Sequence, residues 1–320
     1  MGTVVALTGQ VGGAKLVDGL YRLRGTDLAA IVNTGDDYEH LGLHFSPDID
    51  TVLYMLSGIA SPSAPWEPAG ESHALFATLK QFGGPDRLSL GDRSLAAPLL
   101  RTAWEAEDRR LTAITLDFCK QLGIGARVLP MTDEPVRTHV LTVDGEVSFQ
   151  EYFTTLACEP VVKGFHYIGA EDAHLTPEVS DALDAADLEA VILCPANPYH
   201  TIRPILEVPG MPEMLRKRGA PVIAVTPIVG GKALKGSAGK IMSELRHEAS
   251  ARRVALEYHR LIDGFVIDRE DAASAEDVRA SGIEVLVANT VMRTVEDRAE
   301  LARAVLAFAQ AIRERRLQEA

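Results

Sequence analysis

The first thirty residues alternate between apolar runs and a glycine-rich segment. Residues 4–7 form a short apolar run that ends at once in Thr-Gly-Gln-Val-Gly-Gly-Ala-Lys over residues 8–15. An amphipathic segment over residues 16–23 follows, and residues 28–32 are apolar again. A strand, a glycine loop, a helix and a second strand in this order are typical of the opening of a parallel α/β sheet.

The alternation of predicted strands with loops and helices returns in the second half of the chain. Apolar runs that read as buried strands cover residues 188–193, 222–225, 265–268 and 285–288. Continuous apolar runs of this length are expected of strands that are covered on both faces. The sequence therefore predicts an α/β fold with a Rossmann-like open, mostly parallel sheet.

A long amphipathic helix is predicted at the end of the chain, over residues 295–316. Thr294 and Asp297 have the spacing of a capping box at its start. Apolar side chains recur at helical spacing and predict a stripe that packs on the sheet, with an oligomer contact as the alternative. The stripe consists of Leu301, Val305, Phe308 and Ile312.

The region from about residue 60 to residue 160 does not follow the alternation of strands and helices. Three segments have helical spacing of apolar residues, namely 71–82, 95–101 and 112–122. Residues 127–129 and 137–143, followed by an Asp-Gly pair and residues 147–149, predict a β-hairpin, because Asp-Gly between two such runs is a hairpin signal. We expect a single α/β domain over residues 1–320, in which a helical and β-hairpin insert over about 60–160 covers the active site.

Composition narrows the classes of protein that are possible. The chain has 320 residues, 47% of them hydrophobic, and 45 acidic against 32 basic residues give a net charge of −13. This charge argues against a nonspecific nucleic-acid binder. The three cysteines have neither disulfide nor zinc spacing, and no signal peptide or membrane span is apparent. We therefore expect a soluble, cytoplasmic protein without a nucleic-acid or membrane partner.

Four aspartates stand close together in the sequence, on two turns after the second predicted strand. They are Asp36, Asp37, Asp48 and Asp50. Carboxylates gathered beside an apolar framework are costly unless something positive lies among them, so the group favours a divalent cation or a pocket that uses the negative charge. The alternative is that Asp36 and Asp37 form a turn and that Asp48 caps a helix.

The glycine loop over residues 9–15 is a candidate phosphate site. Backbone amides at a helix N-terminus face anions favourably. The spacing is not G-x-G-x-x-G, which counts against a nicotinamide-dependent dehydrogenase, and Ala14 and Leu16 do not fit a P-loop. A tight strand-to-helix turn is the alternative explanation of the glycines.

Further polar groups stand where strands are predicted to end. The turns over residues 194–198 and 226–232 fall at carboxyl ends of parallel strands, where open α/β sheets bind ligands. Asp92 and Arg93 lie side by side in a turn, where a surface ion pair is the alternative to a functional role. Amides for phosphates and carboxylates for a metal are what transfer of a phosphate-linked group from a nucleotide donor requires.

Six ordered motifs resemble the 2-phospho-L-lactate transferase family, which acts in the biosynthesis of the deazaflavin coenzyme F-420. They cover residues 33–37, 46–54, 90–93, 129–133, 195–198 and 226–231. The resemblance implies that the ribityl hydroxyl of the deazaflavin Fo attacks the distal phosphorus of a GDP-linked donor. GMP leaves, and a phosphodiester joins Fo to a three-carbon acid.

The resemblance also implies roles for individual residues. It places Asp36 and Asp48 at a Mg²⁺ ion, and Asp48 or Asp50 as the acceptor of the hydroxyl proton, with the choice left open. It places Asp50, Thr51, Asp92 and Arg93 at the deazaflavin. The positions on the nucleotide and phosphate side are Gly9, Gly12, Gly13, Lys15, Asn197, Thr226, Pro227, Gly230, Gly231 and Lys232.

The three-carbon acid of the donor is phospholactyl, phosphoenolpyruvyl or phosphoglyceryl in the family, and we expect phosphoenolpyruvyl here. A homodimer is also expected from the resemblance. Gln10 departs from the Gly-Gly pair that is usual in the family. The alternative function is a regulator of related fold that binds a nucleotide or deazaflavin without catalysis.

Overall fold

The structure is a computed structural model that describes residues 2–84, 90–217, 219–233 and 237–319. Its centre is a seven-stranded sheet in the order β14-β13-β10-β9-β1-β2-β5, and every pair of neighbours in it is parallel. The prediction of an open, mostly parallel Rossmann-like sheet is thus confirmed. Its strands are β1 (Val4–Thr8), β2 (Leu28–Val32), β5 (Arg127–Pro130), β9 (Ala190–Leu193), β10 (Val222–Val225), β13 (Gly264–Asp268) and β14 (Glu284–Ala288).

Two apolar cores lie on the two faces of this sheet. Within β1, Val5 and Leu7 belong to one core, and Val4 and Ala6 belong to the other. This alternation follows from the period of two along a strand, and it explains why the central strands are apolar at every position.

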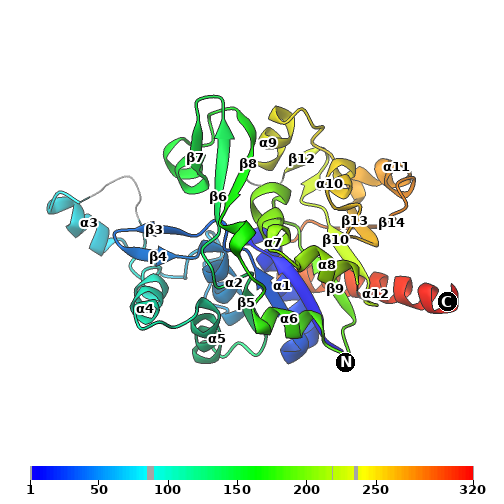
Figure 1. Ribbon diagram of the computed structural model, residues 1–320, viewed down its shortest axis with the longest axis horizontal. Coiled ribbons are helices and arrows are strands. Elements are labelled where there is room, and N and C mark those ends of the chain that lie inside the picture. The colour runs from blue at the N-terminus through cyan, green and yellow to red at the C-terminus, as the bar shows by residue number, and fades with distance from the viewer. Residues whose placement is uncertain (1, 85–89, 218, 234–236, 320) are drawn as a thin grey trace.

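Helices cover both faces of the sheet (Figure 1). One core includes residues of α1 (Gln10–Arg24), α2 (Pro47–Ser57), α5 (Leu111–Gln121) and α12 (Val295–Glu319). The other includes residues of α6 (Pro177–Leu183), α7 (Arg203–Glu207), α8 (Met211–Arg216), α9 (Ala238–Glu244), α10 (Ala251–Tyr258) and α11 (Ala275–Arg279). In the part of the chain that is described, none of the helices combines the length and the apolar content needed to cross a bilayer.

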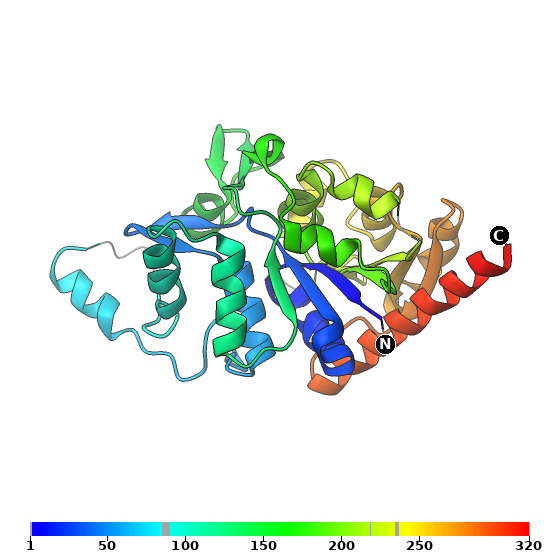
Figure 2. The same cartoon turned by 60° about the horizontal axis from the view of Figure 1, so that its bottom comes forward.

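The terminal helix α12 begins with the predicted capping box. The Asp297 backbone N–H donates to Thr294 Oγ1, and Asp297 Oδ2 accepts from the Thr294 N–H. In the predicted stripe Leu301, Val305 and Ile312 are buried, and Phe308 packs against the same core. The helix covers the sheet and also lies along α1, so that it crosses the lower side of the molecule in Figure 2.

Glycines permit two of these close approaches. A Cβ on Gly19 of α1 would lie 2.1 Å from the Arg298 carbonyl oxygen of α12. A Cβ on Gly264 of β13 would lie 2.6 Å from the Phe308 ring. At these positions any side chain would push α12 away from its neighbours.

The expected insert over about 60–160 contains one strand of the central sheet, and its hairpin gains a strand beyond residue 160. β5 lies inside this range, yet it pairs with β2 as the edge strand of the central sheet, because fully buried Val128 and Leu129 need cover on both faces. The Asp144-Gly145 hairpin is confirmed as β6 (Arg137–Thr142) with β7 (Glu146–Ser148). However, β8 (Val162–Ile168) adds a third antiparallel strand beyond the expected limit.

Two parts of the chain project from the sheet in Figure 1. The three-stranded sheet β7-β6-β8 stands at the top of this view. The hairpin of β3 (Tyr38–His40) and β4 (Leu43–Phe45) points to the left, near α3 (Ala74–Gln81) and α4 (Ala96–Glu105). The remaining short elements are β11 (Ile228–Val229), β12 (Lys232–Ala233), η1 (Gly25–Asp27), η2 (Glu151–Thr155), η3 (Ala170–Asp172), η4 (Pro198–Ile202) and η5 (Arg269–Ser274).

Candidate active site

The order of the strands reverses between β1 and β9. From β1 the chain continues to β2 on one side, whereas β9 leads to β10 on the other side. The loops that leave the carboxyl ends of two such strands diverge and open a crevice, which is where doubly wound α/β proteins bind ligands. The polar residues that follow β1, β2 and β9 meet here.

Asp48 is held at this point by two donors from different strand ends. Asp48 Oδ1 accepts from the Gln10 backbone N–H at 2.8 Å, and Asp48 Oδ2 accepts from Asn33 Nδ2 at 2.9 Å. Gly9 lies directly against this carboxylate, because a Cβ on Gly9 would be 2.3 Å from Asp48 Oδ2. Asp48 belongs to the first turn of α2, and its buried carboxylate reaches the start of α1.

Asp36 is held by a buried histidine. His200 Nδ1 lies 3.0 Å from Asp36 Oδ2, and the His200 ring stacks on Phe149 with centroids 4.1 Å apart. Gln10 Nε2 lies 3.3 Å from His200 Nε2. If the amide donates to Nε2, the imidazole carries its proton on Nδ1 and donates it to Asp36. Asp36 Oδ1 is buried, and no partner among the described residues reaches it.

Burial and neighbouring charges raise the pKa of both of these carboxyl groups. Burial and the charge of Asp36 raise the pKa of Asp48 to about 8, although Asn33 and Gln10 oppose the shift. Burial also raises the pKa of Asp36, and His200 opposes that shift. Two adjacent buried carboxylates, one with an unpartnered oxygen, fit a divalent cation. No group of three or more His, Cys, Asp or Glu side chains suited to a metal occurs within the described ranges. Mg²⁺ usually takes only one or two carboxylates and completes its shell with water and substrate phosphate.

Gln10 occupies the position at which the sequence departs from the Gly-Gly pair of the family that it resembles. Its φ of +56° is a left-handed value that favours glycine. Both polar atoms of the Gln10 side-chain amide have partners. Nε2 lies near His200, and Oε1 accepts from the Asn197 N–H at 3.3 Å. The strain is thus offset by hydrogen bonds that link α1 to η4, directly beside Asp36 and Asp48.

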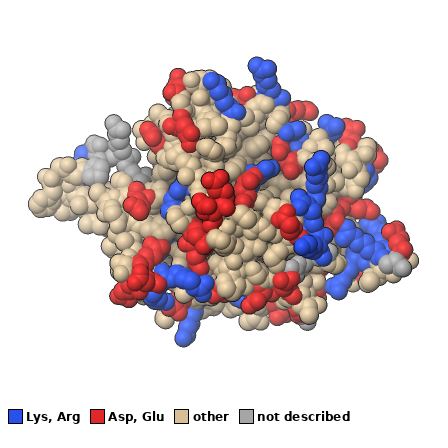
Figure 3. Space-filling model, viewed as in Figure 1, with Lys and Arg blue, Asp and Glu red and all other residues tan. Residues whose placement is uncertain are grey.

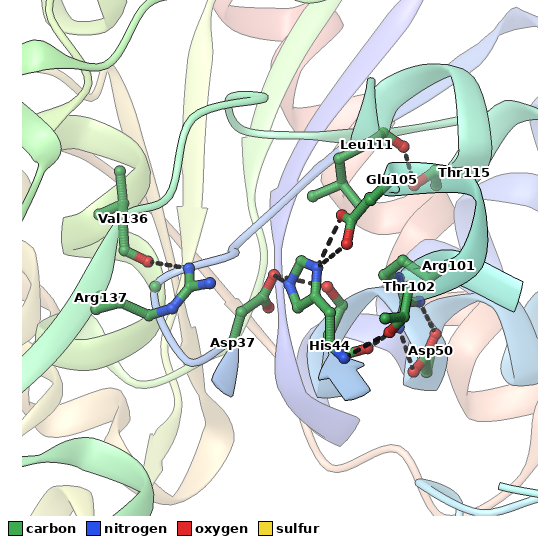
Figure 4. A network of polar contacts seen from close by, with 12 residues as sticks. Asp37, His44, Asp50, Arg101, Thr102, Glu105, Leu111, Thr115, Val136 and Arg137 are labelled. Atoms are coloured by element: carbon green, nitrogen blue, oxygen red, sulfur yellow. Dashed lines mark hydrogen bonds and ion pairs between the residues drawn. The ribbon is translucent and has the colours of Figure 1, made fainter. Parts of the chain in front are cut away.

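Asp50 differs from Asp48 in its surroundings. Its carboxylate accepts from both Nη atoms of Arg101, with the shorter distance 2.5 Å. The Arg101 side chain is completely buried on α4, and the pair lies beside the His44 region in Figure 4. As a proton acceptor Asp50 is therefore weaker than the sequence suggested, because its oxygens already receive charged hydrogen bonds. Thr51 is buried next to it in α2.

Asp37 belongs to a separate network with His44 (Figure 4). Asp37 Oδ2 accepts from Ser46 Oγ at 2.6 Å and lies 3.1 Å from His44 Nε2, while His44 Nδ1 lies 2.8 Å from Glu105 Oε1. Burial lowers the pKa of His44, but the hydrogen bonds and charges of Asp37 and Glu105 outweigh burial and raise it to about 9. His44 therefore carries a positive charge at neutral pH.

We expect the stability of the protein to fall between about pH 6.5 and pH 9 because of His44. The pKa is raised in the folded state, so the stabilisation is complete below the ordinary histidine pKa and is lost as the pH rises through about 9. The loss should reach at most about 3 kcal/mol in the free energy of unfolding, measured by denaturant titration at each pH. His44→Gln should remove this slope, whereas His166→Gln, at a side chain that is 67% exposed, should keep it. An unchanged slope in His44→Gln would contradict the assignment.

Asp92 and Arg93 lie in a turn that packs on residues 69–75. The Asp92 carboxylate accepts from Ser72 Oγ and from the N–H groups of Ala74 and Leu75, so that it caps α3. Arg93 Nη1 donates to the Ala69 carbonyl oxygen. Over the ranges described, neither residue has a hydrogen bond or ion pair to Asp36, Asp48 or Asp50. Their contact with a deazaflavin stays a prediction.

The glycines of the phosphate loop lie at the start of α1. A Cβ on Gly12 would be 2.5 Å from the Pro195 carbonyl oxygen, and a Cβ on Gly13 would be 2.3 Å from Thr8 Oγ1. The alternative explanation, a tight strand-to-helix connection, therefore accounts for both glycines. Lys15 Nζ donates to the Met292 carbonyl oxygen at 2.8 Å. Anion binding at this helix start stays a prediction, and one amide, that of Gln10, is already bonded to Asp48.

The two other strand-end turns are separated by one strand spacing. The Asn197 side chain accepts from the Tyr199 N–H at 2.9 Å and begins η4. After β10, Thr226 Oγ1 accepts from the Ile228 N–H, and Gly230 N–H donates to Asp271 Oδ2. Pro227 is half-buried, whereas Gly231 and Lys232 are exposed in the β11–β12 hairpin. The structure thus joins Asn197 to the aspartates through Gln10 and places residues 226–232 further along the same edge.

A cavity of about 350 Å³ opens beside the aspartates, between the acidic loop and the β6–β7 hairpin. Residues 35–39 form one wall, and residues 137–139 and 148–150 form the other. A larger cavity of about 710 Å³ lies between α12 and the residues that precede β9 and β10. We favour the smaller one as the ligand site, because it is at the carboxyl edge of the sheet.

The charge on the outer surface is mixed. In Figure 3 acidic and basic side chains are interspersed on the visible face, and blue side chains gather toward the end of α12. Arg313, Arg315 and Arg316 lie in this last part of the helix.

Four functional candidates were missed in the sequence. Asn33 and Gln10 stood inside recognised segments but received no role. His200 follows the Pro-Ala-Asn-Pro turn by two residues, so the turn could have drawn attention to it. Arg101 gave only a weak signal, namely a charge three residues after buried Pro98 on the apolar side of α4.

Comparisons with known proteins identify the family and the fold. Residues 4–305 match a protein-family model described as 2-phospho-L-lactate transferase CofD. A phosphoenolpyruvate transferase of Kitasatospora aureofaciens is 37% identical over 97% of this chain and 98% of its own length. A 2-phospho-L-lactate transferase of Methanosarcina mazei is 34% identical over 95% of this chain and 99% of its own length. The crystal structure of a UPF0052 protein from Bacillus halodurans has the same fold, with a TM-score of 0.62 at 18% identity, and the alignment covers 95% of this chain and 98% of that one.

Proposed function

The chain belongs to the 2-phospho-L-lactate transferase CofD family, and we propose that it transfers a phospho-three-carbon-acid group from a GDP-linked donor to the deazaflavin Fo. The observation that carries the proposal is the pair of buried carboxylates, Asp36 and Asp48, at the point where the strand order reverses. Phosphoryl transfer depends mainly on positioning and on neutralising charge, and a cation held by these carboxylates would serve both.

Asp36 and Asp48 would hold Mg²⁺. When bound, this ion supplies positive charge that stabilises the diphosphate oxygens as the bond to the GMP phosphate breaks. The chain's own contribution is rigidity. Gln10 and Asn33 fix both oxygens of Asp48, and His200 fixes one oxygen of Asp36, so that the unpartnered Oδ1 can face a ligand.

The reaction forms a bond between the ribityl oxygen of Fo and the distal phosphorus of the donor. The bond from that phosphorus to the GMP oxygen breaks, and GMP takes the electron pair. The hydroxyl proton passes to a base. Asp48 is favoured because its donors, Gln10 and Asn33, are neutral, whereas Asp50 is bonded to the charged Arg101.

We propose phosphoenolpyruvyl as the three-carbon group. Four relatives named phosphoenolpyruvate transferases, from Kitasatospora and Streptomyces, are 36–37% identical to this chain. The relatives named 2-phospho-L-lactate transferases are 32–34% identical. The difference in identity supports the choice of donor, and a product assay decides it.

Mass spectrometry with competing donors tests the reaction. Purified protein receives Fo, Mg²⁺ and equal amounts of the phospholactyl, phosphoenolpyruvyl and phosphoglyceryl GDP-linked donors. We expect one dominant product with the mass of the phosphoenolpyruvyl ester of Fo. A different dominant mass would correct the donor. Binding of Fo without any product would favour a regulator that binds the ligand without catalysis.

His200 is expected to control metal affinity through Asp36. Replacing it by phenylalanine keeps a flat ring for Phe149 to stack on but removes the hydrogen bond to Asp36. The affinity for Mg²⁺, titrated calorimetrically in the presence of GDP, should fall about 10- to 100-fold, as is typical when a partner of a metal ligand is lost. His166→Phe, on the exposed face of β8, is the matched control. Equal affinities in both variants would show that His200 does not hold Asp36 for a metal.

A further inference from the structure

The cavity beside the aspartates contains one cation that faces carboxylates without pairing to them. Arg137, at the start of β6, lines the cavity together with Asp36, Asp37 and Glu39. Across the described ranges, its guanidinium donates to one acceptor, the Val136 carbonyl oxygen at 2.8 Å, and has no carboxylate within ion-pair distance. Figure 4 shows Arg137 and Asp37 on facing sides of this space.

The backbone fixes the position of Arg137 relative to Asp36. The N–H of Thr138 donates to the Gly35 carbonyl oxygen at 2.6 Å, so that the residues next to Arg137 and Asp36 are joined directly. Gly35 allows this approach, since a Cβ there would lie 2.6 Å from Thr138 Oγ1. The main chain at Arg137 is therefore held close to the loop that carries Asp36.

The cavity adjoins the proposed reaction centre, because Asp36 is among its lining residues. Phe149 lines the cavity and stacks on His200, which in turn bonds Asp36. A ligand that places a phosphate at Asp36 and Asp48 would direct its adjoining group into this space. A half-buried guanidinium is suited to a carboxylate or phosphate there, because its planar donors can bind two oxygens at once.

We infer that this cavity is the subsite for the three-carbon acid and that Arg137 binds its carboxylate. The inference rests on the proposed function. Of the two substrates, the donor has both a diphosphate and a carboxylate, and the carboxylate is attached next to the phosphorus that reacts. Arg137 would thus orient the transferred group and leave the guanosine side and Fo to other parts of the site.

The variants Arg137→Gln and Arg137→Lys test the inference through binding. Dissociation constants are measured calorimetrically with Mg²⁺ for three probes, namely the enolpyruvyl GDP-linked donor, GDP and Fo. In Arg137→Gln the donor should bind about 10- to 100-fold more weakly, as expected for lost hydrogen bonds to a charged group. GDP and Fo should bind as they do to the wild-type protein. Arg137→Lys keeps the charge without the fork, so its loss for the donor should be smaller.

Lys163→Gln is the matched control, because it removes one exposed positive charge from β8 of the same small sheet. Donor binding in this control should equal that of the wild type. Weakening of GDP to the same degree as the donor would mean that Arg137 contacts the diphosphate, and would overturn the inference. Unchanged donor binding in both Arg137 variants would also overturn it, while the proposed reaction would stand. Failure of the wild-type protein to bind the donor at all would overturn the proposed function itself.

Discussion

Asp48→Asn should lower kcat for transfer to Fo by about 10²- to 10⁴-fold, at saturating Mg²⁺ and donor. Asparagine has nearly the same size, but it has no negative charge with which to bind a metal ion or accept a proton. Both Asp48 oxygens accept hydrogen bonds, from Gln10 and Asn33. In asparagine an NH₂ group, which is a donor, replaces one of these oxygens, so one of the two hydrogen bonds is lost. The measurement is the initial rate of Fo ester formation by mass spectrometry.

The loss of activity in Asp48→Asn should not come with a loss of the fold. Burial and the charge of Asp36 raise the pKa of Asp48 to about 8, so the carboxylate is poorly stabilised in the protein without metal. Because this raised pKa already favours the neutral form of the group, a neutral asparagine should cost little, and the free energy of unfolding should stay within about 1 kcal/mol of the wild type. Asp144→Asn is a suitable control, since Asn-Gly forms the β6–β7 turn as well as Asp-Gly does. Turnover of Asp48→Asn within a few-fold of this control would refute a role at the reaction centre.

Arg101→Leu should destabilise the protein by about 3–5 kcal/mol in the free energy of unfolding. The Arg101 side chain is fully buried, and its removal leaves the carboxylate of Asp50 buried without a partner charge. Denaturant titration at neutral pH measures the effect. The double variant Arg101→Leu with Asp50→Leu should recover most of the stability, because it removes the unpaired charge as well.

An exposed ion pair provides the comparison for Arg101. Arg216 and Glu213 lie on α8 with side chains that are 50% and 56% exposed. Arg216→Leu should change the free energy of unfolding by at most about 1 kcal/mol, since water screens such pairs. If Arg101→Leu were as mild, Asp50 would have to be neutral in the fold, and the ion pair would contribute little.

Most of the elements could be predicted because their signals are local. Strands such as β1 and β9 are apolar at every position, since both of their faces are covered. The terminal helix carries its own start signal in Thr294 and Asp297. The assignment of β5 to the insert has a local cause too, because a four-residue strand before a hairpin does not reveal which sheet it joins.

The candidate site could be predicted only in part. Asp36 and Asp48 were found because carboxylates gathered on turns are unusual beside an apolar framework. Their partners were not found, since His200 is 164 residues away from Asp36 and Arg101 is 51 residues away from Asp50. No periodicity or spacing connects residues that far apart.

The sequence alone determined the parallel α/β class, the family and the carboxylates, because strand burial, helix caps and ordered motifs are properties of neighbouring residues. The difference between those carboxylates comes from the packing of the folded chain around them. The order of the strands puts β1 between β2 and β9, and this brings Gln10, Asn33 and His200 around Asp36 and Asp48. Asp50, two residues from Asp48, faces Arg101 instead. Charge and burial at a carboxylate depend on what the fold packs around it, and a strand order reversed at another point would have given the same aspartates different partners.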